Sequence, residues 1–259
     1  MKRRRWAPLF ALVLASPAQA SDSAEAESPA AVVVDAGHGG ADFGASGVNG
    51  VLEKDLTLAV ARRVAAELRA RKVPVVLTRD RDEFVSLAKR TEIANRAHAR
   101  MYLSIHANSA PEPEVEGIET YFLSVDASDA EAMRVALTEN DVYKQEGTAS
   151  DSHDVVGSIL GDLIRTEHLR ESSDLAAIIQ RSLAKLPGGS RGVKQAPFVV
   201  LTGVNMPAAL VEIGFVTNAA DAKRLAQRDV QTSLAKALAA ALVEAMGQTR
   251  DMPASGEQR

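Results

Sequence analysis

The segment Val32-Val33-Val34-Asp35-Ala36-Gly37-His38-Gly39-Gly40 indicates the class of fold. Its first three residues form a short apolar run typical of a buried strand, and a glycine-rich loop over 37–50 follows directly. Beyond the loop, apolar side chains recur at four-residue spacing, which predicts an amphipathic helix over 54–71. A strand, a glycine-rich turn and a helix in this order are typical of an α/β protein with a largely parallel sheet.

The same alternation continues along the chain. Apolar runs predict further strands over 73–77, 101–106, 117–123, 198–201 and 208–213. Helical periodicity predicts helices over 86–98 (with Ser86 as its N-cap) and 173–186, and two C-terminal helices, the last over 230–246. We therefore expect a single α/β domain over 31–247, a twisted, mostly parallel sheet flanked by helices.

The segment 124–173 interrupts this rhythm. It is rich in Asp, Glu and Ser and holds two candidate helices, 130–144 and 155–168. A long insertion of this kind is commonly a lid or a regulatory element. We interpret it as a helical regulatory insertion on one domain and not as a second domain.

The N-terminus has the features of an export signal. Four basic residues at 2–5 precede a short apolar core over 6–16, and Ala18-Gln19-Ala20 forms a small-x-small cleavage site. The apolar core is too short for a stable membrane span. We expect 1–20 to be a signal peptide and the protein to be periplasmic, by the general or the twin-arginine route. The alternative is a basic tail followed by an apolar helix of the domain.

Two further segments have the composition of unfolded chain. Residues 21–30 are small, acidic and polar, which predicts a linker, and 248–259 form a polar tail that we expect to be disordered.

Composition narrows the possible functions. The 259 residues carry a net charge of −4, which argues against a nucleic-acid-binding surface. The chain has no cysteine, so thiolate zinc sites, iron–sulfur clusters and cysteine nucleophiles are excluded. A metal site would have to be built from carboxylates and from the five histidines.

Four side chains stand where a pocket is expected. His38 and His106 lie at the ends of two predicted strands, Glu53 precedes the first helix, and Glu212 lies in an apolar strand. Taken singly, His38 could be a structural hydrogen-bonding residue and Glu53 a helix N-terminal charge. Together, two imidazoles and one carboxylate are a common catalytic zinc set, and a further carboxylate supplies the base.

These residues carry a resemblance to a known family. The chain resembles the type 3 family of zinc-dependent N-acetylmuramoyl-L-alanine amidases, from about residue 31 to residue 246. The resemblance rests on 33–40 with Gly47, on Glu53-Lys54-Asp55-Leu56, on Leu77-Thr78-Arg79, on Ser104-Ile105-His106-Ala107-Asn108, on 190–196 and on 210–218.

The resemblance implies a twisted sheet flanked by helices, one zinc ion held by His38, Glu53 and His106, and Glu212 as the catalytic residue. It also implies hydrolysis of the amide between N-acetylmuramic acid and L-alanine of peptidoglycan, for wall remodelling or daughter-cell separation. Two alternatives stay open: a zinc peptidase that cuts within the stem peptide, and an inactive wall-binding or regulatory module. The inactive module would be expected to lack one of the four residues.

Three further residues are weaker candidates. The insertion 124–173 resembles that of the daughter-cell-separating amidases, in which a helix covers the zinc, and Glu139 best matches the glutamate that closes the coordination. An activator protein that binds the displaced insertion would then open the site. Asn108 and Arg191 are candidates for positioning the substrate, and His98, His153 and His168 are expected at the surface.

Overall fold

The computed structural model describes residues 32–145 and 168–250. The predicted signal peptide, 1–20, and linker, 21–30, lie outside the described residues. So does nearly all of the second predicted helix of the insertion, 155–168, and the tail beyond residue 250.

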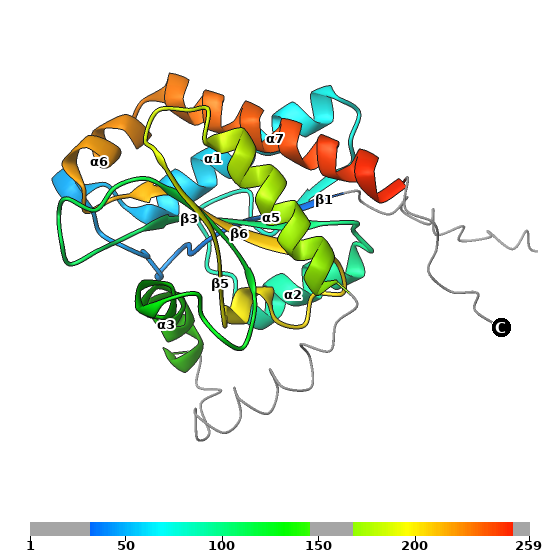
Figure 1. The fold of residues 1–259 in the computed structure, drawn as a ribbon, viewed down its shortest axis with the longest axis horizontal. Coiled ribbons are helices and arrows are strands. Elements are labelled where there is room, and N and C mark those ends of the chain that lie inside the picture. Colours follow the sequence, from blue (N-terminus) through cyan, green and yellow to red (C-terminus); the bar gives the residue numbers. More distant parts are fainter. Residues whose placement is uncertain (1–31, 146–167, 251–259) are drawn as a thin grey trace, which may run out of the picture.

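A six-stranded sheet forms the centre of the described part of the chain (Figure 1). The strands lie in the order β2-β1-β3-β6-β4-β5, and all neighbours are parallel except β4 and β6. Their bounds are β1 (Val32–Ala36), β2 (Val75–Leu77), β3 (Tyr102–Asn108), β4 (Ile118–Leu123), β5 (Ser190–Ala196) and β6 (Ala208–Phe215). The predicted fold class, a mostly parallel α/β sheet, is confirmed.

Helices cover both faces of this sheet. One apolar core lies between the sheet and α1 (Glu53–Ala70), α5 (Leu169–Leu183) and α7 (Arg228–Arg250). The second core lies on the opposite face, under α2 (Leu87–Arg96), α3 (Ala130–Gln145) and the 3-10 helix η2 (Val199–Leu201). The shorter α6 (Ala219–Leu225) follows β6, and the 3-10 helix η1 (Val48–Gly50) lies in the glycine-rich loop. No helix among the described residues has the length and apolar character needed to cross a membrane.

Helix α1 forms where the spacing predicted it. Val60, Val64 and Leu68 are fully buried on one side of the helix and pack on β1 and β3. Helix α2 begins after Ser86, whose hydroxyl accepts a hydrogen bond from the Lys89 N–H at 3.1 Å, as expected of an N-cap.

The prediction of a strand over 198–201 is wrong, because residues 199–201 form η2 and Phe198 is its N-cap. Asn140 of α3 holds this segment: its side chain accepts from the Val199 N–H at 2.9 Å and donates to the Pro197 carbonyl at 2.8 Å. The backbone groups that a sheet would pair are thus satisfied by a side chain. A short apolar run fits a buried 3-10 turn as well as a strand.

The bounds of other helices and strands also differ from the predicted ones. The edge strand β5 was not predicted, since its sequence is polar and most of it is only half-buried. Helix α5 begins at Leu169 instead of Ser173, and α7 runs from Arg228 to Arg250 instead of over 230–246.

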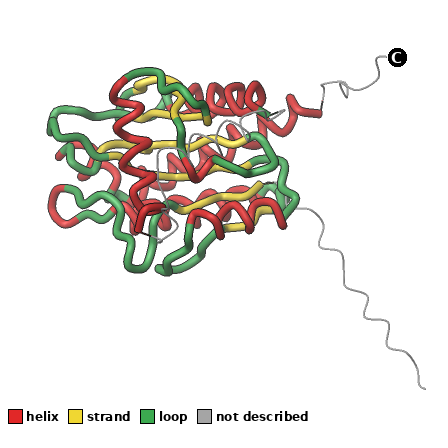
Figure 2. The backbone as a smooth tube through the Cα atoms, turned by 90° about the horizontal axis from the view of Figure 1, so that it is seen from below, coloured by secondary structure: helices red, strands yellow, loops and turns green. Residues whose placement is uncertain are grey.

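The first predicted helix of the insertion is confirmed as α3. Seen from below, a helix crosses the strands near one end of the sheet (Figure 2). Ala132, Val135 and Ala136 are its buried contacts with the second core. Glu139 of α3 lies 3.1 Å from His38, which follows β1, and 2.8 Å from His106 of β3. Helix α3 therefore covers the carboxyl ends of these two parallel strands, where α/β proteins place their ligands.

Candidate metal centre

Four side chains from four separate elements meet beneath α3. His38 follows β1, Glu53 is the first residue of α1, His106 lies in β3 and Glu139 comes from α3. Each offers one ligand atom, all of these atoms lie within 4.8 Å of one another, and all four residues are buried. We call these four residues the metal cluster.

The distances within the metal cluster are short. Nε2 of His38 lies 3.1 Å from both Glu53 Oε1 and Glu139 Oε2. Nδ1 of His106 lies 3.0 Å from the same Glu53 oxygen and 2.8 Å from the same Glu139 oxygen. Nε2 of His38 and Oε2 of Glu139 nevertheless make no hydrogen bond, although both are buried. Buried polar atoms without partners are costly, and a cation between them would satisfy them.

Partners outside the metal cluster fix two of its members. Asp42 accepts a hydrogen bond from Nδ1 of His38 at 2.8 Å, which leaves Nε2 directed at the cluster. Glu53 accepts from the Ala107 N–H through Oε1, at 2.9 Å, and from the Ala45 N–H through Oε2, at 2.8 Å.

Two glycines make room for these side chains. A Cβ atom on Gly37 would lie 2.5 Å from the His106 ring, and one on Gly44 would lie 2.6 Å from both Glu53 Oε2 and the His38 ring. Gly44 also has a positive φ of 64°. The glycine-rich loop thus lets the backbone approach the ligand side chains closely.

The electrostatics of the metal cluster fit a divalent cation. Burial alone would lower the pKa of both histidines, but Glu53 and Glu139 outweigh it and raise the pKa of His38 and His106. The two imidazolium ions hold the pKa of both carboxyls below its usual range in spite of their burial. A divalent ion bound by the two neutral imidazoles would supply the same two positive charges to the buried carboxylates.

A buried ion pair supports the loop that carries His38. Arg90 Nη1 lies 2.6 Å from Asp35 Oδ1, and the same guanidinium donates to the carbonyls of Ala36 and His38 at 2.7 and 2.8 Å. Asp35 also accepts from Thr78 and Ser104, at 2.6 Å each. Arg79 donates to the carbonyls of Ala36 and Gly37, among others. Sequence reasoning missed Arg90, because no local pattern marks a partner 55 residues away.

Asp35→Asn is expected to lower the free energy of unfolding at pH 7 by about 3 kcal/mol, because it leaves Arg90 buried without its counterion. Burial would raise the pKa of Asp35, but Arg90 and the hydroxyl donors lower it to about 2. The carboxylate therefore stabilises the fold above its ordinary pKa of 3.8, and this contribution is lost as pH falls through 2.

Urea denaturation at several pH values measures this effect. The difference in the free energy of unfolding between wild type and Asp35→Asn should decrease by about 2 kcal/mol as the pH falls from 4 to 2. Asp174→Asn, a change at an exposed position of α5, is the control and should follow wild type throughout. A pH-independent gap would contradict the assigned role of Asp35.

Glu212 lies beside the metal cluster and outside it. It is fully buried in β6, paired in register with His106 of β3 on one side and with Glu119 of β4 on the other. Neither of its carboxyl oxygens has a hydrogen-bond partner. Burial, and after it the charge of Glu139, raises the pKa of Glu212 well above its usual range. A carboxyl in such surroundings favours uptake of a proton, as a general base must.

The two candidates for substrate positioning both contact Glu119. Arg191 Nε lies 2.6 Å from Glu119 Oε1, and Asn108 Nδ2 lies 3.5 Å from Glu119 Oε2. Glu119 is fully buried in β4 and was missed by sequence reasoning. Its signal, a carboxylate inside an apolar strand, is the same one that singled out Glu212.

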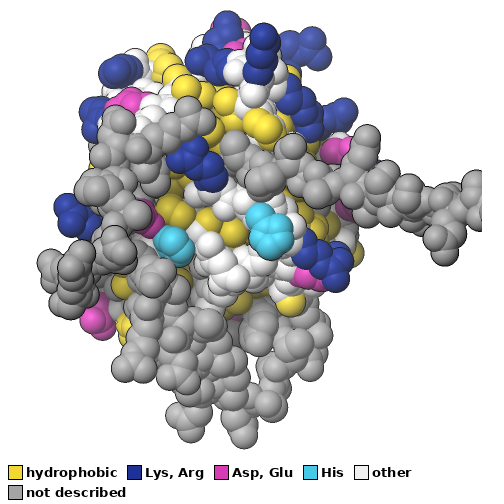
Figure 3. Space-filling model, turned by 90° about the vertical axis from the view of Figure 1, so that its right-hand side faces the viewer, with side chains coloured by type: hydrophobic (Ala, Val, Ile, Leu, Met, Phe, Trp, Pro, Cys, Tyr) yellow, Lys and Arg dark blue, Asp and Glu magenta, His cyan; other side chains and the backbone are white. Residues whose placement is uncertain are grey.

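The remaining described histidines lie apart from the metal cluster. His98 is exposed, and His168 is half-buried with its Nδ1 2.6 Å from Glu171. Figure 3 shows histidine side chains on one outer face of the molecule, among basic and apolar ones. His153 lies outside the described residues.

The sequence of the chain is similar to those of known proteins. Residues 32–244 match the model of a family described as N-acetylmuramoyl-L-alanine amidase. The chain is 35% identical over 215 residues to the N-acetylmuramoyl-L-alanine amidase AmiA of Escherichia coli, covering 82% of this chain and 74% of that protein.

Solved structures agree. The amidase AmiC2 of Nostoc punctiforme is 33% identical, with a TM-score of 0.65, and covers 85% of this chain and 98% of that one. An N-acetylmuramoyl-L-alanine amidase from Clostridium difficile 630 is 26% identical, with a TM-score of 0.64 and the same coverage.

Proposed function

The chain belongs to the N-acetylmuramoyl-L-alanine amidase family and hydrolyses peptidoglycan, and we propose that His38, Glu53 and His106 hold one zinc ion beside which Glu212 acts as the base. The observation that carries the proposal is the convergence of these three buried side chains, with Nε2 of His38 left without a hydrogen-bond partner. Two imidazoles and one carboxylate are a common catalytic zinc set.

Each residue has a distinct task in this proposal. When bound, zinc supplies Lewis acidity that polarises the scissile carbonyl and makes a water molecule more acidic. Glu212 takes the proton of the attacking water and returns it to the leaving amine of L-alanine. Asp42 keeps the His38 ring oriented, and the Ala45 and Ala107 N–H groups keep the Glu53 carboxylate in place.

The identity of the cleaved bond tests the proposal directly. Purified protein should release intact stem peptides from peptidoglycan, and a chelator should stop the release. Mass analysis of the fragments separates this outcome from cleavage within the stem peptide. Shortened peptides that still end in muramic acid would contradict the proposed bond.

We further propose that α3 is an autoinhibitory element. Glu139 lies within the metal cluster, 2.8 Å from His106 Nδ1, in the place that substrate or water needs. An activator protein that binds α3 better in its displaced position would shift the population toward the open state. A bias of about 3 kcal/mol keeps the open form below about 1%.

Glu139→Ala is expected to raise basal activity by up to about 100-fold without a partner, because Glu139 is the residue of α3 that contributes a ligand atom to the metal cluster. Dye release from labelled peptidoglycan by the purified protein measures it. Thr138→Ala, a change at the neighbouring exposed residue, is the matched control and should leave activity unchanged. If Glu139→Ala is folded, zinc-loaded and no faster than wild type, α3 is not inhibitory.

We also propose that the protein is exported to the periplasm and acts in wall remodelling or daughter-cell separation. The basic, apolar and small-x-small segments within residues 1–20 support export. Mass determination of the mature protein from the periplasmic fraction should give Ser21 as the first residue.

A further inference from the structure

Two basic side chains of β5 lie at the other end of α3. Arg191 and Lys194 both contact the buried carboxylate of Glu119, at 2.6 and 3.0 Å. Both also contact Glu131 in the first turn of α3, at 2.6 and 3.3 Å. Lys194 lies 3.5 Å from Asp129 as well. We call Arg191 and Lys194 the cation pair.

Most of the negative charge around the cation pair belongs to α3 and the residue before it. With α3 in place, two cations face three carboxylates, those of Glu119, Glu131 and Asp129. When α3 is displaced, only Glu119 remains. The open enzyme therefore has one unbalanced positive charge at this position, and such a charge favours binding of a carboxylate.

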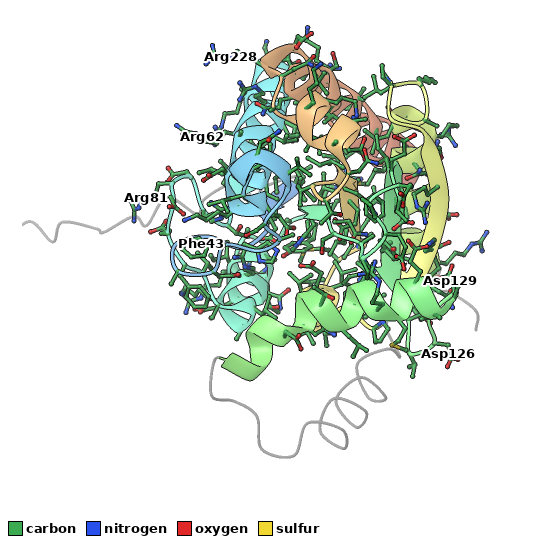
Figure 4. All side chains as sticks on the ribbon, turned by 90° about the vertical axis from the view of Figure 1, so that its left-hand side faces the viewer. Phe43, Arg62, Arg81, Asp126, Asp129 and Arg228 are labelled. Atoms are coloured by element: carbon green, nitrogen blue, oxygen red, sulfur yellow. The ribbon has the colours of Figure 1, made fainter. Side chains whose placement is uncertain are left out.

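The cation pair lies in line with the reaction centre. His106, Glu212 and Glu119 stand opposite one another on the neighbouring strands β3, β6 and β4, and β5 follows β4. Helix α3 crosses this row, from Asp129 at one side of the molecule towards the side where Phe43 lies (Figure 4). Glu131 and Glu139 are eight residues apart, about 12 Å along the helix axis. Thus α3 places one carboxylate at the metal cluster and another at the cation pair.

We propose that Arg191 and Lys194 form a carboxylate-binding subsite for the stem peptide, which Glu131 occupies while α3 is in place. The ligand class is an acidic peptide with a free carboxylate within about four extended residues of the scissile amide, since each residue spans about 3.3 Å. This inference rests on the proposed function, because it takes the metal cluster as the place of cleavage.

The cation pair is already ordered for such a ligand. Glu119 holds Arg191 through Nε, and the guanidinium lies 5.3 Å from the centre of the Phe215 ring. Its Nη2 is left to bind both oxygens of Glu131, at 2.8 and 2.6 Å. A peptide carboxylate would take the same two contacts. Helix α3 thus occupies two of the positions that the substrate uses.

Removing the carboxylate of Glu131 and removing one of the two cations should change KM in opposite directions. In the Glu139→Ala background, Glu131→Gln removes the competing carboxylate and should lower KM for stem-peptide substrates. Arg191→Gln or Lys194→Gln removes the subsite and should raise KM about 10-fold with little change in kcat. If the ion pairs only fasten α3, all three variants shift KM in the same direction, and the inference fails.

Two variants keep this comparison interpretable. Lys194→Gln leaves the Arg191–Glu119 pair intact, so it decides the question if Arg191→Gln does not fold. Arg181→Gln is the matched control, because Arg181 also lies in an ion pair, with Glu244, but on the opposite face of the sheet. Its KM should equal that of the Glu139→Ala parent.

A change in the substrate tests the same contact. Soluble muramyl peptides in which one carboxylate at a time is replaced by a carboxamide should show one position where the amide raises KM about 10-fold. In Lys194→Gln this preference should shrink. Cleavage of all the peptides with equal KM would overturn the subsite and leave the amidase function intact.

Binding of the released stem peptide distinguishes a failure of the proposed amidase function from a failure of the proposed subsite. Calorimetry with the Glu139→Ala protein should show that the carboxylate form binds about 10-fold tighter than the carboxamide form, and that Lys194→Gln removes the difference. An enzyme that binds the peptide with this preference but cleaves nothing contradicts the proposed function. Equal binding of both forms contradicts the subsite.

Discussion

Glu212→Gln is expected to lower the rate of peptidoglycan hydrolysis by about 100-fold or more while metal content stays unchanged. The amide keeps the shape of the side chain and cannot take up the proton of the attacking water, a contribution typically worth 10²–10⁴ in rate. Glu212 is outside the metal cluster, so the loss should fall on turnover and not on metal affinity. Dye release under saturating zinc, together with metal analysis, measures both quantities.

The control for this variant is Glu244→Gln, at an exposed position of α7. It should retain the wild-type rate. Because Glu212 is buried and its carboxyl oxygens make no hydrogen bond, the amide removes no existing contact of the fold. A folded, zinc-loaded Glu212→Gln protein that works at the wild-type rate would remove Glu212 from the mechanism.

His106→Ala is expected to abolish hydrolysis to the limit of detection, because it removes one of three ligands and with it most of the metal. Once α3 and Glu139 are displaced, only His38 and Glu53 remain, and they cannot make up the three-ligand set of a catalytic zinc site. Metal content by mass spectrometry should fall well below one ion per chain. Chelation of the wild-type protein should give the same loss, and added zinc should restore activity.

His98→Ala is the matched control, since His98 is exposed and lies outside the metal cluster. Its metal content and rate should match wild type. Circular dichroism shows whether His106→Ala keeps its fold. Full zinc occupancy in that variant would reject the ligand assignment.

The strongest part of the sequence prediction was the part that depends on burial. Strands β1, β3 and β6 are fully buried and consist largely of apolar residues. The sequence alone therefore predicts the positions of these strands and the polar residues that lie in them or directly after them. Predicted strand ends brought His38 and His106 to one edge of the sheet, and the structure places them with Glu53.

What could not be predicted depends on contacts between distant residues. Edge strand β5 has little buried surface and therefore no apolar pattern. The Asp35–Arg90 pair joins residues 55 positions apart, and the contacts of Arg191 and Lys194 with Glu131 arise only because α3 folds back across the sheet. Glu139 was named only through a family resemblance, and nothing in its own helix distinguishes it from a solvated charge.

The buried arginines behind the metal cluster bear on how its geometry could be lost. Arg79 and Arg90 hold the carbonyls of residues 36–38, and Asp42 orients the His38 ring. The position of one ligand therefore depends on residues that do not themselves lie in the metal cluster. A substitution at Arg79 or Arg90 should weaken metal binding from a distance, although every ligand residue is still present.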